Sequence, residues 1–447
     1  MKKSSAASIL HFIISLLMIS IIIVSAVSCS PATTDPINTI SSSLSQSSVK
    51  ANSSPAMSET PAPANTPSIE QWNAATTIVL KDAGLESINM DNFYWSPDAK
   101  FIIFMGYIKN KDNKFIMNVY LLRVSDKKLI KLIDGTIDNM TDYIVKPQWS
   151  GDGSLAVINF CSITRKKYFI YLYNTKQETL ELIPVNGFFP SISPDKSKMV
   201  YFDKNYGLSL FEFSNRTGTV ISGKIKGVYP IWFSDNKRIL FSRKTGKNPL
   251  GLEETEIYDI CIMDTRKPEG IRSLGFEGLP CELAWMVRNE LAWTKTRHED
   301  GDYFGVFDIA SLKMIDLGKK NEKTYQMLKG ELYYIQLDEI VSGGQYGYQL
   351  LDHNRKVIGA FAVGENNYNV RPFYALSLLP DKRLFYLQAD TGNNKASLAV
   401  SYLNENRFVP LSVIDGSYIP IISEDGAGIA FISKEGDRLI LIDPSKI

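Results

Sequence analysis

Short apolar runs alternate with polar turn segments along the chain from residue 77 to its end. The apolar runs are rich in β-branched and aromatic residues, which suit the pleated, half-buried surface of a β-sheet. Runs of this kind occupy residues 101–104, 199–202, 239–241, 384–387 and 429–432. More polar runs, such as 129–133 and 179–183, fit outer-edge strands. The pattern therefore predicts an all-β domain.

One turn phrase recurs between these runs. Four clear copies begin at Pro147, Pro190, Pro230 and Pro420, and each places an Asp five residues after the Pro. Looser copies surround Asp98 and Asp381, and degenerate ones lie near Asn289 and Gly330. Pro presets φ, Asp accepts a hydrogen bond from a nearby backbone N–H, and Gly or Asn tolerates the positive φ that closes the hairpin. The phrase is therefore interpreted as structural and not catalytic.

The spacing of the phrase predicts a propeller. Successive copies are separated by roughly 40 to 54 residues, the length of a four-stranded antiparallel propeller blade. The count predicts eight blades, or seven if the unit near Gly330 is not a blade. The final unit supplies only three strands, and residues 77–80 are expected to donate the fourth and close the ring.

The Ser-Pro-Asp phrase at residues 96–98 and 193–195 resembles the TolB-like β-propeller repeat, whose pattern is close to Pro-x-Trp-Ser-Pro-Asp-Gly-Lys. The likeness covers about residues 77–447. It implies the same β-propeller fold. The chain is unlike TolB itself in its amino-terminal anchor, its long tether and its lack of a preceding α/β domain, so the resemblance implies the fold and not a place in the Tol system.

The amino terminus predicts export and lipidation. Lys2 and Lys3 precede an apolar run, and Ala26-Val27-Ser28-Cys29 resembles the lipobox of bacterial lipoproteins. Residues 1–28 are therefore expected to be a signal peptide, and Cys29 the diacylated new amino terminus that anchors the protein in the bilayer. An uncleaved transmembrane helix is the alternative. Either places the domain outside the cytoplasm, on the bacterial cell membrane, or on the outer membrane of a Gram-negative cell.

Residues 29–76 are expected to be a disordered tether. They are rich in Ser, Thr, Pro, Ala and Asn and contain few large apolar residues that could offset the entropy of ordering. Such a segment, if extended, reaches on the order of 100 Å. The propeller domain is then residues 77–447.

Charge and cysteine content narrow the chemistry. Lys plus Arg (49) nearly balance Asp plus Glu (48), which argues against a nucleic-acid partner. Cys161, Cys261 and Cys281 lack metal-ligand spacing and are expected to be small buried hydrophobes, although a disulfide between Cys261 and Cys281 is conceivable. We expect no cofactor, no metal and no catalytic residue.

Aromatic residues supply the candidate ligand-binding set. Several lie at or just before the innermost strand of a blade, where the chain approaches the mouth of the central channel. The set comprises Phe93, Phe188, Phe189, Tyr229, Phe373, Tyr374 and Tyr418. These residues can either stack on a peptide or glycan or pack between adjacent blades.

Two loops are further candidates. Residues 299–302 form a carboxylate-rich turn that can be a Ca²⁺ loop or a solvated hairpin. Residues 244–255 are longer than a tight hairpin requires, and long loops on rigid scaffolds often carry recognition.

The combined expectation is a non-enzymatic, membrane-anchored binding or interaction module for an envelope protein, peptide or cell-wall glycan. Two alternatives stay open. One is an envelope polysaccharide hydrolase or lyase, which requires carboxylates that face the channel. The other is an accessory or sensor subunit of a membrane complex, because propellers host many functions.

Overall fold

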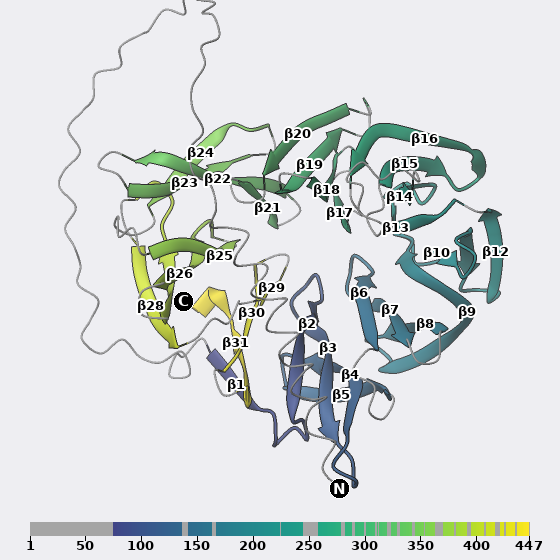
Figure 1. The fold of residues 1–447 in the computed structure, drawn as a ribbon, viewed down its shortest axis with the longest axis horizontal. Helices are drawn as coiled ribbons and strands as arrows, with labels where there is room; N and C mark the ends of the chain where they lie inside the picture. Colours follow the sequence, from purple (N-terminus) through teal and green to yellow (C-terminus); the bar gives the residue numbers. More distant parts are fainter. Residues whose placement is uncertain are drawn as a thin grey trace, which may run out of the picture. The chain divides into compact units, whose positions relative to one another are not determined.

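The protein is all-β and adopts a propeller-like arrangement of antiparallel sheets (Figure 1). The computed structural model describes residues 75–135, 142–162, 167–223, 225–244 and 258–278, and most of residues 282–446. The described part contains no helix that is long and apolar enough to span a bilayer. The predicted fold class is confirmed at this level.

Four sheets cover the first half of the described chain. The first sheet contains β2 (Ser87–Trp95), β3 (Phe101–Lys109), β4 (Phe115–Arg123) and β5 (Lys128–Ile133). A seven-stranded sheet follows, with β6 (Tyr143–Trp149), β7 (Leu155–Ser162), β8 (Lys167–Asn174), β9 (Thr179–Ile192), β10 (Lys198–Asp203), β11 (Leu208–Glu212) and β12 (Thr217–Ser222). Next come β13 (Gly227–Trp232), β14 (Arg238–Lys244), β15 (Tyr258–Asp264) and β16 (Lys267–Gly278), and then β17 (Glu282–Val287), β18 (Leu291–His298), β19 (Gly301–Asp308) and β20 (Lys313–Lys319).

Three sheets complete the described domain. The first of these contains β21 (Lys323–Leu328), β22 (Glu331–Val341), β23 (Gln345–Leu351) and β24 (Val357–Ala362). The second contains β25 (Val370–Leu378), β26 (Leu384–Asp390), β27 (Lys395–Ser401) and β28 (Phe408–Asp415). The last contains β29 (Ile421–Ile422), β30 (Ile429–Ile432), β31 (Arg438–Ile442) and β1 (Ala75–Val79), and a short 3₁₀ turn, η2 (Pro444–Lys446), follows it.

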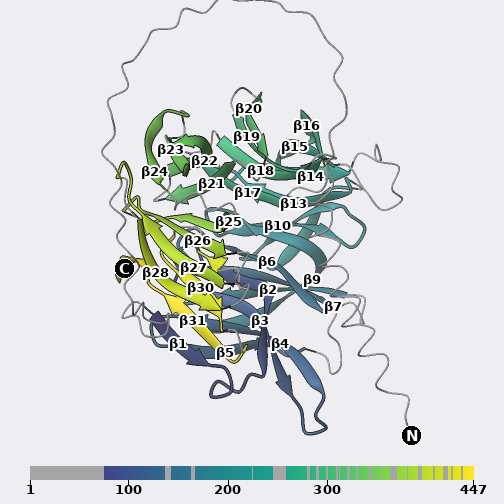
Figure 2. The same cartoon turned by 60° about the vertical axis from the view of Figure 1, so that its left-hand side comes forward.

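The amino-terminal strand completes the last sheet. β1 pairs antiparallel with β31, with Ala75 opposite Ile442 and Val79 opposite Arg438. Figure 2 shows β1 beside β31. The expected donation of a strand by residues 77–80 is confirmed, although the strand begins two residues earlier.

Hydrophobic side chains pack between successive sheets. One core cluster joins the first sheet to the last and includes Phe93, Trp95, Ala430 and Leu441. Trp95 Nε1 also donates a hydrogen bond to the carbonyl of Ile421 at 3.2 Å. Because this cluster contains strands from both ends of the domain, burial of apolar surface ties those ends together.

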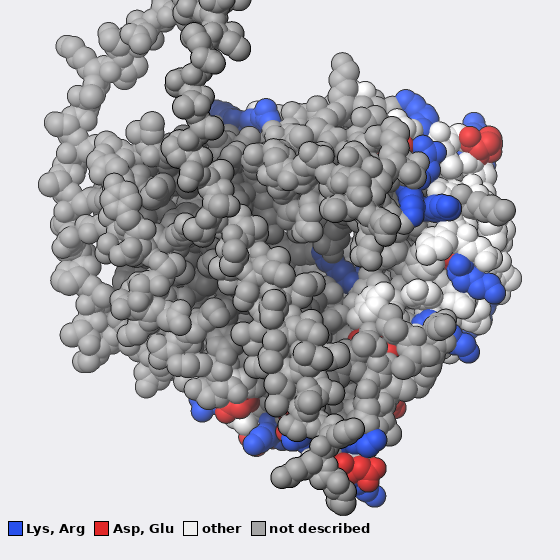
Figure 3. Space-filling model, viewed as in Figure 1, with Lys and Arg blue, Asp and Glu red and all other residues white. Residues whose placement is uncertain are grey.

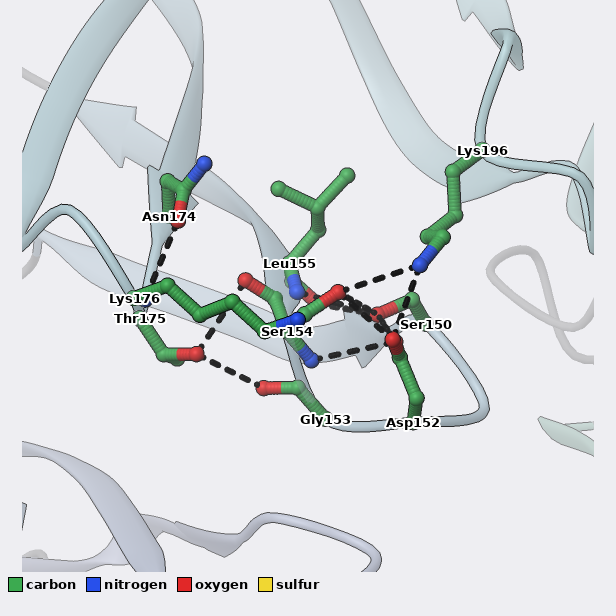
Figure 4. Close-up of polar contacts among 9 residues, drawn as sticks. All are labelled: Ser150, Asp152, Gly153, Ser154, Leu155, Asn174, Thr175, Lys176 and Lys196. Atoms are coloured by element: carbon green, nitrogen blue, oxygen red, sulfur yellow. Dashed lines mark hydrogen bonds and ion pairs between the residues drawn. The ribbon is translucent and has the colours of Figure 1, made fainter.

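The recurring phrase forms a turn closed by Ser and Asp (Figure 4). Ser150 Oγ donates to Asp152 Oδ1 at 2.8 Å and accepts a hydrogen bond from the N–H of Leu155 at 2.9 Å. The N–H of Ser154 donates to Asp152 Oδ1 at 3.2 Å. Because Ser150 is buried, these side-chain bonds satisfy polar groups that water does not reach.

Side chains also connect the turns of neighbouring sheets. Lys196 Nζ, from the turn after β9, contacts Asp152 Oδ2 at 2.8 Å (Figure 4). The N–H of Asp195 donates to Asn236 Oδ1, in the turn after β13, at 2.8 Å. The hydrogen bond from Lys196 lowers the pKa of Asp152 well below its usual range. The repeated polar residues therefore stabilise turns and their neighbours, as the sequence predicted.

The residue after the turn Asp adopts a positive φ. Gly153 (φ 67°) and Asn236 (φ 58°) fit the prediction, but Ala99 (φ 53°) and Lys196 (φ 60°) occupy the same position. The requirement for Gly or Asn was therefore too narrow, because the Ser and Asp hydrogen bonds hold the turn with other residues as well.

The described thiols are buried. Cys161 and Cys261 are free and buried, as expected, and Cys281 lies outside the described residues. Burial raises the pKa of the Cys161 thiol to about 11. This thiol is therefore protonated at neutral pH.

Candidate functional site

The two ends of each sheet carry different features. In the repeats that carry the Ser–Asp phrase, the inner strand ends at that turn, as β6 does before Ser150 and β9 before Ser193. The second strand of the sheet runs back, so the connection between its second and third strands lies at the opposite end. In the β6–β12 sheet and the β13–β16 sheet, this opposite end is where the inner strands begin and where the aromatic candidates lie.

A bulge interrupts the inner strands near this end. The register shifts between Val145 and Gln148 in β6, and between Val228 and Ile231 in β13. A third shift places Phe188 opposite Phe202 in the pairing of β9 with β10. The residue pairs left out of the ladders are Lys146-Pro147, Phe189-Pro190 and Tyr229-Pro230. Proline fits a bulge because it has no N–H to donate to the ladder.

Two of these bulges bring aromatic rings into contact. Phe189 and Tyr229 both have φ of 53°, the left-handed region that bulky residues avoid at a cost of about 1–2 kcal/mol each. Their ring centroids lie 4.4 Å apart, although the two residues come from neighbouring sheets. Both rings are half-buried. The strained backbone thus presents a pair of rings at this end of the domain.

Phe188 connects this pair to two tyrosines. Its ring lies 5.4 Å from Phe189, 5.4 Å from Tyr168 and 5.0 Å from Tyr206, in edge-to-face geometry. Such aromatic pairs add stabilisation beyond the area they bury. Phe188 is only 7% exposed, whereas Tyr168 is 36% and Tyr206 is 49% exposed. Phe188 is therefore the buried ring against which the exposed Tyr168 and Tyr206 pack.

Tyr143 extends the cluster along β6. It lies opposite Cys161 in the ladder, and Cys161 lies opposite Tyr168. Burial, together with the neighbouring Cys161, Tyr168 and Tyr229, raises the pKa of Tyr143. Burial, followed by Cys161 and Tyr206, raises the pKa of Tyr168. These phenols are therefore neutral at physiological pH and can donate hydrogen bonds.

We call this cluster the aromatic patch. It consists of Tyr143, Tyr168, Phe188, Phe189, Tyr206 and Tyr229. It spans the β6–β12 sheet and the β13–β16 sheet. Exposed rings that carry hydroxyl groups can bind a ligand by stacking and by hydrogen bonding together.

A buried asparagine holds the bulge of β9. Asn159 Oδ1 accepts a hydrogen bond from the N–H of Phe189 at 3.1 Å. Its Nδ2 donates to the carbonyls of Phe169 at 3.1 Å and Gly187 at 3.2 Å. Asn159 is 1% exposed, so these bonds replace the ladder bonds that the bulge removes. Asn159 is therefore a positioning residue for Phe189.

Some of the predicted ligand-binding residues lie in the aromatic patch, and one lies in the hydrophobic core. Phe189 and Tyr229 lie together in the patch, and so does Phe188. Phe93 requires a correction: it is 3% exposed and packs on Phe104 in the core between the first and last sheets, so it cannot contact a ligand.

The remaining candidates are not all described. Phe373 and Tyr374 fall within the register shift of β25, where the backbone alone is described. Tyr418 and Cys29 lie outside the described residues, as do residues 245–255 and 299–300 of the two candidate loops. Among the side chains that the structure describes, no group of His, Cys, Asp or Glu could hold a metal ion.

Sequence reasoning missed Tyr143, Tyr168 and Tyr206. Tyr206 lies in the turn between β10 and β11, and Tyr143 and Tyr168 lie at the ends of β6 and β8. The order of the strands could have indicated these residues. The connections between second and third strands lie at the end of each sheet where the inner strands begin, so residues in those connections approach Phe188, Phe189 and Tyr229.

Comparison with known proteins bears on the fold alone. No family model matches the sequence, and no curated protein matches it in sequence. The structure is similar to dipeptidyl peptidase 4 from Porphyromonas gingivalis, with 13% identity and a TM-score of 0.51 over 76% of this chain and 55% of that chain. It is also similar to the β-propeller domain of the Trilobed protease from Pyrococcus furiosus (11% identity, TM-score 0.42, 76% of this chain and 98% of that chain). A further likeness is to TolB from Acinetobacter baumannii (13% identity, TM-score 0.36, 77% and 80%).

The chain therefore spans about half the length of the Porphyromonas peptidase. The likeness to that peptidase supports a β-propeller fold and carries nothing about activity, because the sequence identity is low and folds host many functions.

Proposed function

We propose that the protein is a membrane-anchored extracytoplasmic lipoprotein whose β-propeller is a non-enzymatic binding module for a protein, peptide or cell-wall glycan. The aromatic patch carries this proposal. Tyr143, Tyr168 and Tyr206 are each more than one-third exposed on a scaffold whose other large side chains are mostly buried. Exposed aromatic groups on a rigid scaffold are typical of a binding surface.

Among the described residues, the positions of four carboxylates favour binding over the hydrolase or lyase alternative: three lie in turns and one is buried. Asp98, Asp152 and Asp195 accept hydrogen bonds within the Ser–Asp turns, at the end opposite the patch. Near the patch, Asp259 is buried and paired with Arg243 at 2.9 Å. These acidic groups stabilise structure, whereas glycoside cleavage requires carboxylates that face the ligand.

A cross-linking experiment tests the proposal. A photo-reactive amino acid replaces Tyr206 in the tagged full-length protein, and cells are irradiated intact. The proposal predicts a specific cross-linked molecule that is lost when Tyr168→Ala is added. The matched control carries the same photo-reactive group at Phe115, which is 40% exposed on β4.

The outcomes of this experiment separate the hypotheses. The same yield from both positions, or a product that Tyr168→Ala leaves unchanged, would exclude the patch as the binding surface. Recovery of a shortened polysaccharide that accumulates with time would support the hydrolase or lyase alternative instead. Recovery of one integral membrane protein would support the accessory-subunit alternative.

The anchor is the second part of the proposal. The lipobox-like sequence before Cys29 supports lipidation, and residues 30–76 supply a tether. Cys29→Ser should move the protein from the membrane fraction to the soluble fraction and abolish its labelling by a palmitate analogue. Unchanged membrane association without labelling would point to an uncleaved signal helix.

We further propose eight TolB-like blades, with seven as the alternative. The seven-stranded sheet can be divided at β9, whose first half pairs with β8 and whose second half pairs with β10. The Ser–Asp hydrogen bonds support the TolB-like repeat. An end-on view by electron microscopy would count the blades.

A further inference from the structure

Lysines surround the aromatic patch. Lys204 lies in the same turn as Tyr206, and Lys167 precedes Tyr168. The N–H of Lys226 donates to the carbonyl of Tyr206 at 3.2 Å, and the N–H of Lys244 donates to the carbonyl of Lys226 at 3.0 Å. We call Lys167, Lys204, Lys226 and Lys244 the basic rim. A backbone hydrogen bond therefore holds Lys226 beside Tyr206, the most exposed tyrosine of the patch, and Lys244 is bonded in turn to Lys226.

The basic rim has a surplus of outward positive charge. Lys167, Lys204 and Lys226 are exposed, and none of them takes part in an ion pair with a carboxylate among the residues the structure describes. Along the right-hand edge of the surface in Figure 3, Lys and Arg side chains are more frequent than Asp and Glu side chains among the described residues. The whole chain has a net charge of only +1, so the surplus is local.

Among the described residues, the carboxylates nearest the basic rim do not neutralise it. Asp203 accepts hydrogen bonds from the N–H groups of Asn205 at 2.7 Å and Gly207 at 3.1 Å, which closes its own turn. Asp259 is buried and bonded to Arg243 and Ser273. Because these two acidic groups are used inside the fold, the lysine ammonium groups are the outward charges that the described residues present beside the patch.

We infer that the ligand of the aromatic patch is a polyanionic glycan, a polysaccharide that carries carboxylate or phosphate groups. This inference rests on the proposed function. A sugar ring has an apolar face and a polar edge, which match the ring face and the hydroxyl group of a tyrosine. The ammonium groups of the basic rim form charge-assisted contacts with the anionic groups.

The exposure of the patch favours a glycan over an acidic peptide. Peptide and protein anchors concentrate their energy in well-packed, desolvated pockets. Tyr206 instead remains 49% exposed, Tyr143 is 38% exposed and Tyr168 is 36% exposed. A row of accessible phenols suits successive sugar units better than a single buried anchor.

Binding assays with defined probes test the inference. The full-length lipoprotein in detergent micelles is titrated with alginate, a polyuronate, with poly(glycerol phosphate), and with dextran as a neutral control. We expect at least one polyanion to bind, dextran to bind at least about tenfold more weakly, and affinity to fall as salt is raised. Binding of alginate alone identifies a carboxylate ligand, and binding of poly(glycerol phosphate) alone identifies a phosphate ligand.

Variants that remove lysine charges test whether the basic rim binds the polyanion. Lys204→Gln combined with Lys226→Gln should weaken polyanion binding by about tenfold and reduce its salt dependence. The matched control combines Lys176→Gln with Lys237→Gln, two exposed lysines at the Ser–Asp turn end, and should retain wild-type affinity.

Three results would overturn the inference. They are binding of neither polyanion, equal binding of dextran, and equal losses in the rim and control variants. The proposed function fails separately, because Tyr206 cross-linking tests the patch whatever the ligand is. A protein cross-linked at Tyr206, with no polyanion binding, would reject the glycan and retain the binding module.

Discussion

Replacing Asn159 with Ala should lower the free energy of unfolding by more than the replacement of an exposed polar residue does. The amide of Asn159 makes three hydrogen bonds to backbone groups, at 3.1, 3.2 and 3.1 Å, and is 1% exposed. Each bond contributes about 1 kcal/mol net, and leaving the N–H of Phe189 unpaired costs about 1–3 kcal/mol more. The expected loss in the free energy of unfolding is therefore about 4–6 kcal/mol.

Urea denaturation, followed by far-UV circular dichroism, measures this loss. Asn174→Ala is the matched control, because Asn174 also makes three hydrogen bonds, to Lys176 and Gln177, but in an exposed turn. We expect the control to lose at most about 1 kcal/mol. An Asn159→Ala variant within about 1 kcal/mol of wild type, or equal losses in both variants, would refute the assignment of Asn159 as the support of the β9 bulge.

Other substitutions test the turns, the joint between the chain ends and the buried thiol. Ala99→Gly should raise the free energy of unfolding by up to about 1 kcal/mol, because Ala99 has a φ of 53°, which glycine adopts without strain. A lower midpoint temperature of thermal denaturation in the variant would contradict this. Gly428→Ala should cost about 1–3 kcal/mol, because its Cβ would lie 2.7 Å from the ring of Trp95, which joins the last sheet to the first; an unchanged urea midpoint would argue against that packing. Burial raises the pKa of Cys161 to about 11, so the folded thiol should resist alkylation at pH 8. The free energy of unfolding should fall as the pH rises from about 8.5, where an unfolded thiol ionises, towards 11. Fast alkylation of the native protein, or a free energy of unfolding that rises over that range, would disprove the burial of Cys161.

Local signals explain what the sequence predicted well. The Ser–Asp turn is specified by residues within six positions of one another, so its hydrogen bonds follow from the phrase itself. The closing strand followed from counting strands in the last repeat.

The remaining features depend on strand register and on neighbouring sheets. In β2 the register shift lies between Asn89 and Phe93, so Phe93 returns to the ladder opposite Phe104 and faces the core. One residue of register decides whether a side chain is buried or exposed. Tyr168 and Tyr206 both pack against Phe188, which the phrase does not position.

Hydrogen–deuterium exchange of the full-length protein, with and without the molecule recovered by cross-linking at Tyr206, tests the central claim most directly. The account predicts slower exchange around residues 143, 168, 188–189, 206 and 229, with little change in the Ser–Asp turns at residues 150–154 and 193–198. Protection confined to those turns, or to the first sheet, would show that the aromatic patch is not the binding surface.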